Sequence, residues 1–165
     1  LQQRLGFVPD TPPLYDYLTG RQYVALVASL WRIPAADRDR RSAPLFEQLG
    51  LDGHVDELCK GYSHGTRKKI HLAAVLTTAA PVLLLDEPSS GLDPLSTRRL
   101  KDLLVAECKR GTTILLSTHG LELAEPAVEA HAKVEVGDVV LRDQDRRLDV
   151  DLRRKRLARH FGDAA

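Results

Sequence analysis

Residues Pro81 to Pro94 read PVLLLDEPSSGLDP, and the interpretation of the whole chain starts from this stretch. Positions 82–85 are all apolar, and a proline stands shortly before and after them. A short apolar run of this kind is typical of a strand that is buried on both faces in the middle of a parallel sheet. The sequence therefore predicts a central strand over Val82–Asp86.

Two adjacent carboxylates, Asp86 and Glu87, end this run. The carboxyl ends of parallel strands face the crevice in which α/β proteins bind their ligands. Neighbouring residues of a strand point to opposite sides, so we expect the two acids to have different roles. One would hold Mg²⁺ and the other would face an attacking water. A strand followed by an acidic turn without function explains the two carboxylates alone equally well.

Three segments, in a fixed order, resemble motifs of the ATPase subunits of ABC transporters. Tyr62-Ser63-His64-Gly65-Thr66 is similar to the signature motif. Residues 81–94 resemble the Walker B motif and the D-loop, and Ser117-Thr118-His119 resembles the segment with the switch histidine. Three ordered motifs are a far stronger signal than any one of them. The resemblance covers about residues 5–142.

This resemblance implies an α/β chain with a partial P-loop NTPase fold of the ABC type. We expect a parallel core sheet, a helical subdomain over about residues 14–80 and a C-terminal β-hairpin. Residues 1–142 would form the C-terminal part of an ATPase domain, and residues 143–165 a charged tail. The strands should follow the order Leu5–Val8, Val82–Asp86, Thr113–Ser117, all parallel, with residues 132–136 and 139–141 as the hairpin.

Local patterns predict where three helices begin. Thr19 with Gln22 three residues later forms a capping box. Ser63 is a suitable N-cap, and a third helix is expected to start after Asp93-Pro94 and to end before Gly111. A helix N-terminus with a small hydroxyl and Gly65 close by is also a natural phosphate site, although a plain cap explains the pattern equally simply.

The family resemblance implies a role for each site residue. Asp86 would organise Mg²⁺, Glu87 would polarise the attacking water, and His119 would contact the γ-phosphate of ATP. Ser63 and Gly65 would cap the γ-phosphate of an ATP held by a second copy, and Asp93 would act across that dimer. Asp10 stands where the family has the glutamine of the Q-loop, and a carboxylate there could hold Mg²⁺ through water.

The sequence contains no phosphate loop of the form G-x-x-x-x-G-K-[S/T]. In the family this loop holds the β- and γ-phosphates, and its lysine supplies the main positive charge. We expect the loop to lie before Leu1, because Asp86, Glu87 and His119 keep the chemistry of a working site. The alternative is a degenerate remnant.

The resemblance predicts an ATP-binding subunit of an export-type ABC transporter, with ATP and Mg²⁺ as cofactors. Its expected partners are transmembrane permease subunits and a second ATPase subunit, at the inner face of the cell membrane. Two alternatives are a non-catalytic interaction module that pairs with an intact ABC ATPase, and a soluble ABC-type ATPase of translation or DNA repair. The transported substrate cannot be inferred, because specificity lies in the membrane subunits.

Composition fits a soluble protein of one domain. Of the 165 residues, 43% are hydrophobic and 28% are charged, and the formal net charge of +1 predicts no nucleic-acid partner. Cys59 and Cys108 stand far apart in the sequence and have no metal-ligand spacing. This favours two buried thiols, or thiols without a function, in a reducing compartment. The basic cluster at residues 153–156 is interleaved with acids in the tail, and a solvated helix is the favoured interpretation.

Overall fold

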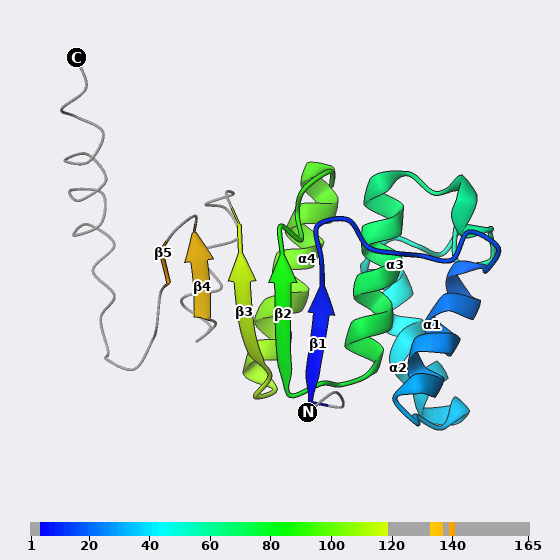
Figure 1. Cartoon of the computed structure of the whole chain (residues 1–165), viewed down its shortest axis with the longest axis horizontal. Helices are drawn as coiled ribbons and strands as arrows, with labels where there is room; N and C mark the ends of the chain where they lie inside the picture. The colour runs from blue at the N-terminus through cyan, green and yellow to red at the C-terminus, as the bar shows by residue number, and fades with distance from the viewer. Residues whose placement is uncertain (1–3, 119–132, 137–138, 141–165) are drawn as a thin grey trace, which may run out of the picture.

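The computed structural model describes residues 4–118, 133–136 and 139–140. Its centre is a sheet in which the strands stand in the order β1-β2-β3-β4-β5 (Figure 1). The strands are β1 (Leu5–Val8), β2 (Val82–Asp86), β3 (Thr113–Ser117), β4 (Lys133–Val136) and β5 (Val139–Val140). The described chain thus has the mixed helix and strand content that the sequence predicts.

The predicted order of the core strands is confirmed. β2 lies between β1 and β3, with Val82 opposite Leu5 on one side and Thr113 on the other, and both pairings are parallel. β4 continues the sheet in parallel beside β3. β5 returns antiparallel to β4, so the expected hairpin is present at the far edge.

The helices are α1 (Gly20–Leu30), α2 (Ala35–Gln48), α3 (His64–Thr77) and α4 (Pro94–Lys109), with a short 3-10 helix, η1 (Cys59–Gly61). The three predicted helix starts are confirmed. Thr19 and Gln22 exchange both bonds of a capping box, and Ser63 and Asp93 accept from the third backbone amide of their helices. Gly111, with φ +93°, follows the end of α4 as expected.

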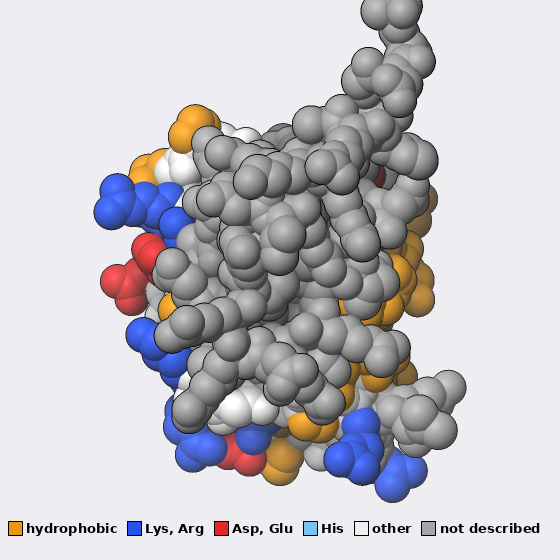
Figure 2. All heavy atoms as spheres, turned by 90° about the vertical axis from the view of Figure 1, so that its left-hand side faces the viewer, with side chains coloured by type: hydrophobic (Ala, Val, Ile, Leu, Met, Phe, Trp, Pro, Cys, Tyr) orange, Lys and Arg blue, Asp and Glu red, His pale blue; other side chains and the backbone are white. Residues whose placement is uncertain are grey.

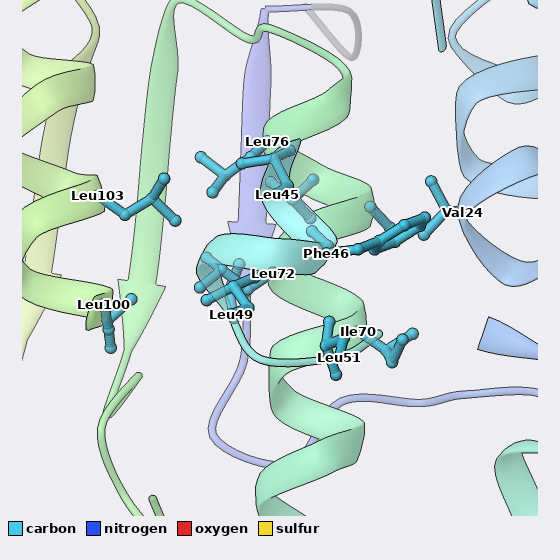
Figure 3. Packing of buried hydrophobic residues seen from close by; sticks show 14 of the residues in the cluster. Val24, Leu45, Phe46, Leu49, Leu51, Ile70, Leu72, Leu76, Leu100 and Leu103 are labelled. Atoms are coloured by element: carbon cyan, nitrogen blue, oxygen red, sulfur yellow. The ribbon is translucent and has the colours of Figure 1, made fainter. Parts of the chain in front are cut away.

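Helix α3 is the central helix of the packing, since it lies against α1, α2 and β1. All residues from Ile70 to Thr77 are buried. Figure 3 shows Leu45 of α2 and Leu49, the residue after α2, beside Leu72 and Leu76 of α3, within the cluster of buried apolar side chains. This cluster also includes residues of α1, α4 and the sheet, so one core joins the helices to the strands.

The prediction that β2 is buried on both faces is wrong. Leu83 and Leu85 are buried, whereas Val82 is 36% exposed and Leu84 is only half-buried. The described helices lie on one face of the sheet, and no helix stands before β1–β3 in Figure 1. Figure 2 shows hydrophobic side chains along its right-hand side, which is the side turned toward the viewer in Figure 1.

No helix in the described ranges has the length and apolar character that crossing a membrane requires. The expected domain boundaries near residues 14, 80 and 142 stay predictions. The charged tail, residues 143–165, lies outside the described residues.

A buried histidine joins three elements beneath the sheet. His71 Nε2 lies 3.1 Å from the carbonyl oxygen of Phe7, and His71 Nδ1 lies 2.7 Å from the hydroxyl of Tyr23. A carbonyl can only accept, so Nε2 carries the proton and Nδ1 accepts from Tyr23. Burial lowers the pKa of His71, against a smaller opposing effect of the Phe7 bond. Burial also raises the pKa of Tyr23 to about 12, so both groups stay neutral.

We expect acid to destabilise the protein through His71. The unfolded chain takes up a proton below the ordinary histidine pKa of about 6.5, and the folded chain does so only at lower pH. The contribution of neutral His71 is therefore complete above pH ~6.5 and declines as the pH falls toward the lowered folded pKa. Chemical denaturation between pH 7.5 and 5.5, above the range in which carboxylates titrate, should show this decline.

His71→Gln should weaken that pH dependence and lower the free energy of unfolding by about 1–3 kcal/mol, because buried partners lose a hydrogen bond. His54→Gln, at an exposed histidine on the surface, is the matched control. An unchanged pH slope in His71→Gln would contradict the assignment.

The open face of the sheet should make the 165-residue chain self-associate. Leu5 is 44% and Phe7 47% exposed, and both lie beside Val82 and Leu84 in the strand register. Contiguous exposed apolar surface favours association. Phe7→Thr with Leu84→Thr should increase the monomer fraction in sedimentation velocity, since threonine suits strands. Leu95→Thr, at an exposed leucine of α4 that is not part of the sheet, should leave that fraction unchanged.

Candidate functional site

The carboxyl ends of β1, β2 and β3 lie side by side at one end of the sheet, because the three strands are parallel and in register. Asp10 lies in the loop after β1, Asp86 is the last residue of β2, and Glu87 follows it. The strand ends thus place three predicted site residues at the same edge, as the position of ligand sites in α/β folds leads one to expect.

Asp86 is exposed and faces the end of β3. Its Oδ1 atom accepts a very short hydrogen bond from the hydroxyl of Ser117, its partner in the strand register. A carboxylate beside a hydroxyl offers the oxygen ligands that Mg²⁺ prefers. The described residues contain no group of three or more histidine, cysteine or acidic side chains that could hold a metal ion. The residues present fit an ion that is held mainly by water and phosphate oxygens.

Glu87 lies just outside β2, in a left-handed conformation with φ +44°. This conformation is disfavoured for residues with a side chain, so the surroundings must hold it. Its backbone N–H donates to the carbonyl of Ser117 at 2.9 Å, and its carbonyl accepts from Ser90 N at 3.1 Å. The alternation of strand residues therefore does not apply to Glu87, and the turn after β2 sets its direction instead.

Lys68 is a residue of this site that the sequence did not reveal. Its side chain is only 1% exposed, and Nζ donates to Asp10 Oδ1 at 2.9 Å and to the carbonyls of Glu87 at 2.8 Å and Ser90 at 3.1 Å. Its ammonium lowers the pKa of Asp10, first through the hydrogen bond and then through its charge. Asp10, at the expected Q-loop position, thus forms an ion pair with Lys68.

A signal for Lys68 exists in the sequence, but it is indirect. Asp10 is an acid where the family has a neutral glutamine, and such a change suggests a compensating cation nearby. Arg67, Lys68 and Lys69 of α3 could each provide that cation, and burial selects Lys68. The helical spacing does not help, because all residues from Ile70 to Thr77 are buried and this part of α3 has no exposed face.

The N-terminus of α3 packs against the loop that follows Glu87. A Cβ atom on Gly65 would lie 2.8 Å from the carbonyl oxygen of Gly91, closer than real contacts allow. Gly91 itself has φ +74°, and the ring of His64 lies against it. Glycine is therefore required at both positions, for close approach at Gly65 and for the backbone conformation at Gly91.

Ser63 is exposed at the same helix end. Its Oγ accepts from the backbone N–H of Thr66 at 3.1 Å and lies 2.9 Å from the Thr66 hydroxyl. The predicted N-cap is confirmed, and the first turn of α3 presents N–H groups at the surface. The structure thus brings Gly65 to the loop after β2, with Ser63 two residues before it at the helix start.

Asp93 is exposed and caps α4. It accepts from the hydroxyl of Ser96 at 2.6 Å and from its backbone N–H at 2.9 Å, and these bonds lower the pKa of Asp93. Its carboxylate thus has a structural task within the chain. His119, the remaining predicted site residue, lies outside the described residues.

Comparison with known proteins identifies the family. A family model described as "AAA domain, putative AbiEii toxin, Type IV TA system" matches residues 22–125, more than half of the chain. The retinal-specific phospholipid-transporting ATPase of Mus musculus is 34% identical over 125 residues, which are 76% of this chain and 5% of that protein.

Two bacterial relatives are ABC transporter ATP-binding proteins by name. The one from Nostoc is 32% identical over 143 residues, covering 85% of this chain and 42% of the relative. The one from Bacillus subtilis, YthP, is 32% identical over 136 residues, covering 82% and 58%. The chain thus spans about half the length of these two relatives.

Solved structures of ABC ATPases have the same fold. An ATP-binding subunit of an ABC transporter superimposes with a TM-score of 0.76 at 26% identity, over 96% of this chain and 64% of that chain. The cbiO1 protein of Clostridium perfringens, described as part of the cbiONQ transporter complex, gives 0.63 at 27% identity, over 82% and 53%. The fold and the relatives together show that the chain belongs to the family of ABC-type ATPases and has part of their P-loop NTPase fold.

Proposed function

We propose that this chain is part of the ATP-binding subunit of an export-type ABC transporter, which couples ATP hydrolysis to transport across a membrane. The proposal rests on the two acids at the end of β2, Asp86 and Glu87, and on the packing of the following loop against the N-terminus of α3. The ABC transporter ATP-binding proteins among the relatives support it.

ATP would bind between two copies of the subunit. The phosphate loop of one copy would hold the nucleotide, and Ser63 and Gly65 of the other would face its γ-phosphate. The start of α3, where Ser63 and His64 are exposed, supports this role, since helix N-termini attract anions through their N–H groups and dipole. Gly65 keeps this helix end against the loop after β2, because a side chain there would meet the carbonyl oxygen of Gly91.

Asp86 is the proposed contact to Mg²⁺, held in place by the Ser117 hydroxyl. When bound, the ion would neutralise charge on the phosphates. Asp10 would reach the ion through water, with one carboxylate oxygen engaged by Lys68. This second contact is compatible with its half-exposed side chain.

Glu87 is the proposed general base, which would orient a water and accept its proton during attack on the γ-phosphate. Its backbone is bonded to Ser117 and Lys68, so the carboxylate starts from a fixed main chain. His119 would contact the γ-phosphate. Asp93 would act across the dimer while it caps α4.

The proposed partners are transmembrane permease subunits and a second ATPase subunit, at the cytoplasmic face of the membrane. Tyr15 and Tyr17, 62% and 88% exposed, follow Asp10 in the loop between β1 and α1. Exposed aromatic side chains are typical of protein contacts and support a docking role for this loop. The expected partner is a membrane subunit, because family members use this region for that contact.

Glu87→Gln should abolish most turnover and leave ATP binding intact, measured in a polypeptide that includes a phosphate loop. The loss should be about 10²–10⁴-fold in kcat, because glutamine cannot accept the proton. Glu57→Gln, at an exposed glutamate paired with His54, is the matched control. Unchanged turnover in Glu87→Gln would move the base role to another residue, with Asp10 the first to test.

The 165-residue chain alone should bind ATP with Mg²⁺ no better than about millimolar, a free energy of roughly −4 kcal/mol. Its sequence has no phosphate loop, and carboxylates at the strand ends repel a polyphosphate. Mg²⁺ bridges the two only weakly because it keeps most of its waters. Isothermal titration calorimetry is the measurement, and micromolar binding would contradict the account.

A further inference from the structure

Lys68 is the only charged side chain in the core of the described part of the chain. It lies in the second turn of α3, and its ammonium sits where the loops after β1 and β2 meet. An ammonium has three donors, and here there are three acceptors, one carboxylate oxygen and two backbone carbonyls. A buried charge persists only when it is paired and fully hydrogen-bonded, and this one meets both conditions.

The contacts of Lys68 act on the turn that contains Glu87. The carbonyl of Glu87 accepts from both Lys68 and the N–H of Ser90, while its own N–H donates to Ser117. Lys68 also bonds the carbonyl of Ser90. Hydrogen bonds at both its N–H and its carbonyl thus hold the left-handed backbone of Glu87, which has φ +44°.

Asp10 supplies the only acid among the three acceptors of Lys68 and so determines where the ammonium can sit. Arg67, which precedes Lys68 on α3, donates to the same loop farther along, at the carbonyl of Leu14 and the carboxylate of Asp16. The second turn of α3 therefore anchors the loop after β1 at two places. One of these anchors is shared with Glu87.

We propose that Lys68, paired with Asp10, is the positioning residue of this site. Its ammonium holds the main chain of Glu87 and Ser90 in the conformation that directs the Glu87 carboxylate. It thereby joins the loop after β1 to the loop after β2 in one hydrogen-bonded cluster. The part of this inference that concerns turnover rests on the proposed role of Glu87, and the part that concerns the loop conformation does not.

Amide hydrogen exchange tests the loop conformation in the chain itself. Lys68→Met keeps the length and apolar stem and removes the donors. The amides of Ser90 and Leu92, bonded within the turn, should exchange roughly tenfold faster or more, while those of Leu83 and Leu85 in β2 change by less than about twofold. Lys69→Met, on the same helix but outside the cluster, is the matched control and should change neither set.

Two exchange results would overturn the proposal. One is unchanged exchange at Ser90 and Leu92. The other is equal acceleration at all four amides, which would mean that Lys68 only stabilises the fold. Asp10→Asn provides an independent test if Lys68→Met does not fold, because Asp10 is half-exposed and asparagine still accepts a bond. It should accelerate the same loop amides selectively, and unchanged exchange would again overturn the proposal.

Turnover tests the connection to Glu87, in a polypeptide that includes a phosphate loop. Lys68→Met should lower kcat by about 10–100-fold with KM for ATP unchanged, as expected for a misplaced catalytic group. Adding Lys68→Met to Glu87→Gln should cause no further loss, because Lys68 acts through Glu87. A multiplicative loss in the double variant would overturn the positioning role.

The outcomes separate the two proposals. If Glu87→Gln has no effect on turnover while the loop amides respond to Lys68→Met, the role of Glu87 is wrong and the conformational role of Lys68 stands. If Glu87→Gln removes turnover and the loop amides do not respond, the proposed function stands and the inference about Lys68 fails.

Discussion

The parallel pairing of β2 with β1 on one side and β3 on the other is the constraint on which the rest depends. It aligns Val8, Leu85 and Leu116 in one register, so the three strands end at the same end of the sheet. Each strand then contributes to the site at this end: Asp10 follows β1, Glu87 follows β2, and Ser117 is the last residue of β3. Because a parallel ladder allows no slip without exposing the buried Leu83 and Leu85, the strand register also determines the geometry of the site.

Electrostatics then determines how the loops are arranged at that edge. The ammonium of Lys68 lies in the core and is neutralised by Asp10, while its other two bonds go to main-chain carbonyls. A charge that is buried this way is costly unless every donor finds an acceptor, so the loops must adopt the one arrangement that provides three. The helix caps at Ser63 and Asp93 add directional hydrogen bonds of the same kind at the ends of α3 and α4.

The packing is one-sided, and this explains the exposed face of the sheet. The four described helices and the buried leucines of β2 share one core, whereas Leu5, Phe7 and Val82 on the opposite face are partly exposed. An apolar run such as residues 82–85 indicates the character of a strand that is covered on both faces. It does not indicate which part of the chain, or which other chain, provides the second cover.

Local physical chemistry determined much of this protein from the sequence alone. Hydrophobic runs located β1, β2 and β3, hydroxyl caps located the starts of α1 and α3, and Asp93-Pro94 located the start of α4, because these signals act between residues close in the chain. Motif order indicated the family and placed Asp86 and Glu87 at the site. Only the tertiary structure selected Lys68 as the partner of Asp10, and it gave Glu87 its left-handed backbone. The physical reason is that burial and charge pairing over 58 residues depend on how distant segments pack, which no local pattern contains.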